Sequence, residues 1–134
     1  MPSRASLAWC GLLAVLAAGC GRQDAPLAPV NGRVFYRGEP LAGGTIVFTP
    51  DPARGGSGPL ACGEVGPDGR YVLRTGGRPG AVAGWHRITV AATPPPGGGP
   101  DALALPPRYS DPEQSGERRE VQPDRVNTLD LHLE

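Results

Sequence analysis

The chain has 134 residues, and its 13 basic and 13 acidic side chains give a formal net charge of zero at pH 7. This balance excludes the strongly basic surface on which nucleic-acid binding depends. The 21 glycines and 17 prolines disfavour helices, which excludes a helical bundle and predicts a turn-rich β domain.

The N-terminus has the pattern of a bacterial lipoprotein signal peptide. Arg4 provides a positive charge, and the apolar residues 7–18 are too few to span roughly 30 Å of bilayer hydrocarbon as a stable helix. The small residues Ala17-Ala18-Gly19 then precede Cys20, as a signal peptidase requires beside the bond it cleaves. We therefore expect residues 1–19 to be removed and Cys20 to be lipidated.

Lipidation anchors a protein to a membrane without any segment that spans it. Each buried methylene of an acyl chain contributes about 0.8 kcal/mol, so several chains on one cysteine hold firmly. The protein is then expected at the cell membrane or the outer membrane, facing the periplasm or the exterior. An ordinary secretory signal and an N-terminal membrane anchor are two other interpretations of the same segment.

The cysteines predict no disulfide. Cys10 leaves with the signal peptide and Cys20 is acylated, so Cys62 remains without an intramolecular partner. Because no histidine or acidic motif stands beside Cys62, we expect a small strand residue rather than a nucleophile.

Strand patterns begin after residues 20–28, which lack periodicity and are expected to form a lipidated tether. About seven short strands follow, separated by turn residues, which is typical of an antiparallel β-sandwich whose two sheets pack face to face. This domain is expected to cover residues 29–134. The expected strands are residues 30–37, 44–49, 60–65, 70–75, 85–92, 117–122 and 126–133.

Two patterns within these strands predict structural detail. The alternation over residues 85–92 places His86, Ile88 and Val90 toward the core. The pair Asp68-Gly69 stands between two strand patterns and predicts a hairpin turn, because glycine adopts a positive φ at no steric cost.

Residues 94–116 are expected to form a flexible Pro/Gly excursion from the domain. This segment begins with Pro94-Pro95-Pro96-Gly97-Gly98-Gly99. Proline cannot donate to a sheet ladder, and glycine is entropically costly to order. Connections of this length are commonly disordered or functional.

A series of short motifs runs through residues 29–134 in a fixed order. They are Val30-x-Gly32-x-Val34, Gly38-x-Pro40-Leu41-x-Gly43-Gly44, Ile46-x-Phe48-x-Pro50, Asp68-Gly69-x-Tyr71-x-Leu73, Gly80-Ala81-x-x-Gly84, His86-x-Ile88-x-Val90, Leu105-Pro106-x-x-Tyr109-x-Asp111 and Asn127-x-Leu129-x-Leu131. In this order they resemble bacterial carboxypeptidase regulatory-like (transthyretin-like) domains of lipoproteins. The resemblance implies a seven-stranded antiparallel Ig-like or prealbumin-like β-sandwich without enzymatic activity.

No motif in the chain predicts catalysis, a cofactor or a metal. A metal site needs three or four clustered ligands, whereas His86 and His132 are the only two histidines. His86 is expected to be a core or edge residue with one hydrogen bond. An enzyme of unknown type would need His86 near an acid in a cleft.

Trp85 is the candidate binding residue, because it should point away from the core if its neighbour His86 points inward. An exposed tryptophan can stack on a sugar ring or anchor a partner, and it can equally cap the domain beneath residues 94–116. We expect a lipid-anchored envelope protein with a structural or interaction role, whose partner is an envelope protein or a glycan. The alternative is a carbohydrate- or peptide-binding module that uses Trp85 and adjacent loops.

Overall fold

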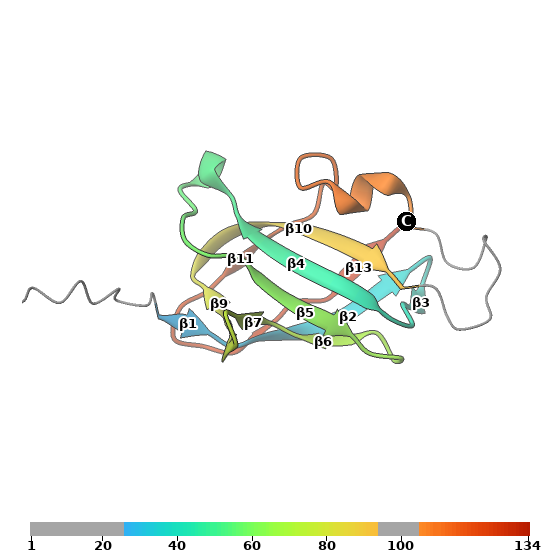
Figure 1. Cartoon of the computed structure of the whole chain (residues 1–134), viewed down its shortest axis with the longest axis horizontal. Helices are drawn as coiled ribbons and strands as arrows, with labels where there is room; N and C mark the ends of the chain where they lie inside the picture. The colour runs from blue at the N-terminus through green and yellow to red at the C-terminus, as the bar shows by residue number, and fades with distance from the viewer. Residues whose placement is uncertain (1–25, 94–104) are drawn as a thin grey trace, which may run out of the picture.

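The computed structural model describes residues 26–93 and 105–134, and nearly all of their regular structure is strand (Figure 1). The prediction of an all-β protein is therefore confirmed. Two short 3-10 helices, η1 (Pro52–Arg54) and η2 (Pro107–Ser110), are the helical segments of this described part. The strands are β1 (Leu27–Ala28), β2 (Val30–Tyr36), β3 (Glu39–Pro40), β4 (Gly44–Pro50), β5 (Ala61–Val65), β6 (Arg70–Val72), β7 (Arg74–Thr75), β8 (Arg78–Pro79), β9 (Ala81–Val82), β10 (Gly84–Ala92), β11 (Arg118–Val121), β12 (Asn127–Thr128) and β13 (Leu131–Leu133).

The larger sheet has the strand order β11-β10-β4-β5-β7-β8 and is antiparallel throughout. Its longest pairing is β10–β4, in register from His86 opposite Pro50 to Ala92 opposite Gly44. β10 is flanked on its other side by β11 over residues 84–87. The β-branched residues of β4 and β10 suit this central, half-buried position.

The second sheet is built around β2 and is not purely antiparallel, which corrects the sequence-based expectation. β3 and β6 run antiparallel to β2, whereas β12 and β13 run parallel to it. The reason is that β11 ends beside the start of β10, and the loop 122–126 then carries the chain across to the start of β2, where β12 begins. The buried Asn127 holds this loop, because its side chain accepts from the Gln122 N–H at 2.8 Å and donates to the Gln122 and Arg125 carbonyls.

The segment expected as one strand over residues 70–75 is divided between the two sheets. β6 pairs with β2, and β7 pairs with β5 and β8. Leu73 lies between them, and its N–H donates to the Val30 carbonyl at 3.0 Å. The predicted turn at Gly66–Gly69 is present, with φ of 83° at Gly69. The strand that follows the turn forms its ladder with β2, however, so no β5–β6 hairpin ladder forms.

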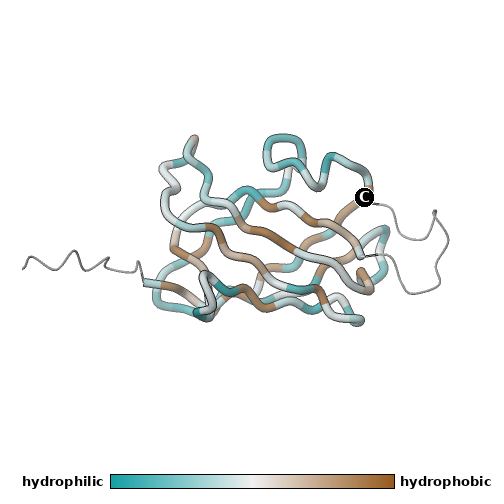
Figure 2. The backbone as a smooth tube through the Cα atoms, in the orientation of Figure 1, coloured by the Kyte–Doolittle hydropathy of each residue, from teal (hydrophilic) through white to brown (hydrophobic). Residues whose placement is uncertain are grey.

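The core lies between the two sheets and is filled by alternate residues of their strands. Figure 2 shows apolar residues concentrated along these strands and polar ones in the loops. The prediction for β10 is confirmed, because His86, Ile88 and Val90 are all buried. The largest fully buried side chains include Tyr71, Phe48, Leu41, Ile46, Leu73, Ile88, Leu131 and Leu133.

Two segments expected to lie outside the fold are packed against it. Leu27–Ala28, expected in the tether, form β1 and pair with β9. In the second half of the expected excursion, residues 105–116, the side chain of Tyr109 is buried and its hydroxyl donates to the Glu134 carbonyl at 3.0 Å. Residues 1–25 and 94–104 lie outside the described residues, so the signal peptide, Cys20 and the Pro/Gly run do as well.

The molecule is elongated, and the chain enters it at one end of the long axis (Figure 1). We call this the entry end and define it by Pro26, Leu27, Ala83 and residues 123–126, which line a common groove. The turn 66–69 and the C-terminus lie at the opposite, far end.

Candidate functional site

Trp85 is the second residue of β10 and is partly buried. The guanidinium carbon of Arg54 lies 4.3 Å from the centroid of its indole ring. The Trp85 carbonyl accepts a hydrogen bond of 2.9 Å from the Asp51 N–H, which fixes the loop that carries Arg54. Such cation–π contacts contribute about 0.5–1 kcal/mol at exposed sites. One face of Trp85 is thus covered by the last residue of η1.

The sequence Asp51-Pro52-Ala53-Arg54-Gly55 explains why η1 forms beside Trp85. The Asp51 side chain caps the helix by accepting from the Ala53 N–H at 3.1 Å. Pro52 occupies the first turn, where no N–H partner is needed, and Gly55 ends the helix with φ of 76°. This capping signal is readable in the sequence, but it marks only one turn in a segment expected to be a loop.

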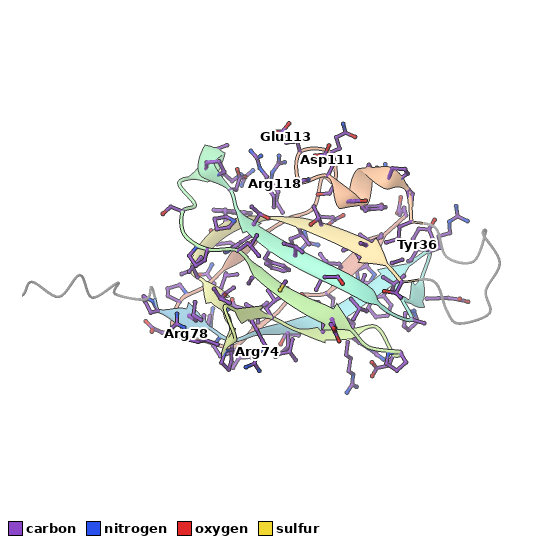
Figure 3. The ribbon with its side chains drawn as sticks, in the orientation of Figure 1. Tyr36, Arg74, Arg78, Asp111, Glu113 and Arg118 are labelled. Carbon is purple, nitrogen blue, oxygen red and sulfur yellow. The ribbon has the colours of Figure 1, made fainter. Side chains whose placement is uncertain are left out.

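Asp51 is also the centre of an ion cluster that the sequence did not predict. Its carboxylate is 1% exposed, with Oδ1 3.0 Å from Arg87 Nε and Oδ2 3.4 Å from Arg118 Nε. Arg87 Nη1 lies a further 3.9 Å from Glu113 Oε1. Figure 3 shows Arg118, Asp111 and Glu113 along this edge of the molecule.

The register of the sheet explains why an acid is needed at this position. Arg87 and Arg118 are direct cross-strand neighbours on β10 and β11, and like charges in that relation destabilise a sheet. Asp51 lies against both guanidinium groups and offsets their repulsion. The cluster therefore ties η1 to β10 and β11 and holds Arg54 over Trp85.

His86 follows Trp85 on β10, and its side chain points to the opposite face, where it is fully buried. It makes one side-chain hydrogen bond, as expected. Its Nδ1 lies 2.9 Å from the Gly84 carbonyl, while Nε2 is buried with no hydrogen-bond partner among the described residues. Its ring contacts Phe48, with 5.8 Å between centroids. Burial lowers the pKa of the His86 imidazole below its usual 6.5, and the bond to Gly84 opposes this only in part.

The lowered pKa of His86 predicts that acid destabilises the domain. As the pH falls below 6.5, the unfolded chain binds a proton at this histidine while the folded chain does not, so the free energy of unfolding decreases until the folded pKa is reached. Urea unfolding measures this free energy at pH 7.5 and at pH 5.0. The decrease between the two pH values should be larger for the natural protein than for His86→Phe. An equal loss in both proteins would contradict the assignment.

Cys62 lies on β5, is exposed and makes no disulfide. It lines an open groove of about 1040 Å³ together with Arg70, Val72 and Arg74. His132 stacks on Phe35 with 4.9 Å between ring centroids. Among residues 26–93 and 105–134, no group of three or more histidine, cysteine or acidic side chains is placed to hold a metal ion.

Comparisons with family models, with curated proteins and with solved structures find no match for this chain. The structure itself defines an all-β protein in which Trp85, Arg54 and the Asp51 ion cluster lie together. Of the two residues singled out from the sequence, Trp85 lies in this site and Cys20 lies outside the described residues.

Proposed function

We propose that this chain is a lipid-anchored protein of the cell envelope, carrying a non-catalytic domain with a structural or interaction role. The observation that carries the proposal is the apolar segment that ends in Ala17-Ala18-Gly19-Cys20. Cys20 holds the lipid, and the domain faces the periplasm or the exterior from the cell membrane or the outer membrane. No helix within residues 26–93 and 105–134 is long and apolar enough to cross a bilayer.

The domain itself is proposed to be a seven-stranded sandwich of the Ig-like or prealbumin-like kind. In this proposal the two-residue strands are extensions of the seven main strands. Two sheets with a shared core support this, as does the long antiparallel pairing of β10 with β4 in the larger sheet. A non-catalytic role is supported by what the buried polar groups do. Asp51, Tyr109 and Asn127 are each engaged in holding two segments of the chain together.

A carbohydrate- or peptide-binding module that uses Trp85 is a second candidate, and the partial exposure of the indole beside a loop favours it. Arg54 lies over one face of that ring at 4.3 Å. A sugar that stacks on this face must displace the guanidinium, whereas a partner with an anionic group can bind it. The structural or interaction role needs no such rearrangement and is the leading proposal.

Replacing Cys20 by alanine is expected to abolish lipid attachment, because Cys20 is the cysteine that follows the small residues Ala17-Ala18-Gly19. Growth with radiolabelled palmitate should label the natural chain and leave Cys20→Ala unlabelled. Processing of the natural chain should be sensitive to globomycin. Cys62→Ala is the matched control and should retain full labelling, since Cys62 lies in the folded domain. Unchanged labelling of Cys20→Ala would refute the anchor.

A further inference from the structure

We propose that the entry end of the domain docks directly on an anionic lipid surface, so that the protein stands on its membrane with a fixed orientation. The docking surface is a groove of about 370 Å³ whose lining includes Pro26, Leu27, Ala83, Pro123, Arg125 and Val126. This inference rests on the proposed lipidation of Cys20.

The length of chain before the domain places this groove near the bilayer. Six residue steps separate Cys20 from Pro26, and an extended chain spans at most about 3.6 Å per residue, or roughly 20 Å. The groove begins at Pro26 itself. An anchor at Cys20 therefore keeps the entry end close to the lipid headgroups, while the turn 66–69 lies at the far end of the long axis (Figure 1).

The groove combines exposed apolar side chains with a cation, which is the chemistry of an interfacial surface. Val126 is 63% exposed, one of the most exposed large apolar residues of the described chain. Arg125 beside it is exposed, and none of the ion pairs found within residues 26–93 and 105–134 involves it. The apolar side chain suits the acyl boundary, and the guanidinium suits a phosphate headgroup.

The loop that carries these two residues is held in place before any membrane is met. The buried Asn127 donates to the Arg125 carbonyl at 3.1 Å and to the Gln122 carbonyl at 3.0 Å. A preorganised loop loses little conformational freedom on docking. Asp124 is the acid of this loop and also lines the groove, so the attraction to an anionic headgroup is carried by the exposed guanidinium of Arg125 itself.

The test places one tryptophan at each end of the molecule. Trp85→Phe removes the tryptophan that remains after signal cleavage. Val126→Trp or Pro67→Trp is then added, at the entry end and the far end respectively. The mature lipidated protein is reconstituted in vesicles of phosphatidylcholine with 30% phosphatidylglycerol, brominated near the headgroup.

Tryptophan emission should be quenched in the Val126→Trp protein and not in the Pro67→Trp protein. Adding Arg125→Ala, or omitting phosphatidylglycerol, should lower the ratio of anchored protein whose domain is docked to anchored protein whose domain is undocked. The expected decrease is roughly fivefold, the effect of one arginine near an anionic surface. Equal quenching at both ends, or none at Val126→Trp while the protein floats with the vesicles, would overturn docking. A protein that fails to float would instead refute the lipid anchor.

Discussion

Replacing Asp51 by alanine should lower the free energy of unfolding by about 2–4 kcal/mol, because a charge-assisted hydrogen bond and a helix cap are lost together. The Asp51 carboxylate is 1% exposed and lies 3.0 Å from Arg87 Nε. Without it, Arg87 and Arg118 face each other across β10 and β11 with no nearby carboxylate of comparable burial. Urea denaturation followed by circular dichroism measures the loss.

Two control variants separate charge from capping and from general surface effects. Asp51→Asn removes the charge but keeps an oxygen that can accept from the Ala53 N–H, so its loss should be smaller than that of the alanine variant. Asp68→Ala removes an exposed acid paired with Arg70 and should cost at most about 1 kcal/mol. If Asp51→Ala were as stable as Asp68→Ala, the cluster would not hold the fold.

Gly32→Ala, at the one glycine of β2, should lower the free energy of unfolding by about 3 kcal/mol. A Cβ at this position lies 2.0 Å from the Leu129 carbonyl oxygen, which is backbone and cannot move aside freely. That oxygen also accepts from the Tyr71 hydroxyl, and the Leu129 N–H donates to the Asn31 carbonyl at 2.8 Å. The added methyl therefore pushes apart β2 and the chain between β12 and β13.

Gly66→Ala is the matched control for this substitution. Its Cβ meets only Asp68 Oδ1 at 3.3 Å and the Arg70 carbonyl oxygen at 3.5 Å, and the first of these belongs to an exposed side chain rather than to the backbone. Thermal unfolding should show a clear decrease in Tm for Gly32→Ala and little change for Gly66→Ala. Similar Tm values would mean that the parallel pairing of β2 does not require the glycine.

The features that the sequence predicted correctly depend on local periodicity. Alternation in β10 is sufficient to place His86, Ile88 and Val90, because the side chains of a strand point to opposite faces in turn. The turn at Asp68-Gly69 follows from the conformational freedom of one glycine. Both predictions use information from within a few residues.

What could not be predicted depends on which segments meet. No local pattern shows that Leu73 is the point where the chain passes from one sheet to the other. The parallel direction of β12 and β13 likewise depends on the loop held by Asn127, whose role is visible only with its partners in place.

The candidate site was predicted in part for the same reason. The outward direction of Trp85 follows from the alternation of β10, but its cover does not. Arg54 lies over the ring because Asp51 is held by Arg87 and by the Trp85 carbonyl, residues more than 30 positions away in sequence. The packing of Tyr109 was missed because its partner, the backbone of Glu134, carries no sequence signal at all.

The parallel pairing of β2 with β13 has a mechanical consequence. The two strands are close to the two ends of the chain, and they point in the same direction. A force that pulls the chain ends apart therefore acts along the strands and loads the hydrogen bonds of their ladder together, as in shear, rather than opening them one at a time. A domain held from its N-terminus and pulled at its C-terminus is in this way braced against tension.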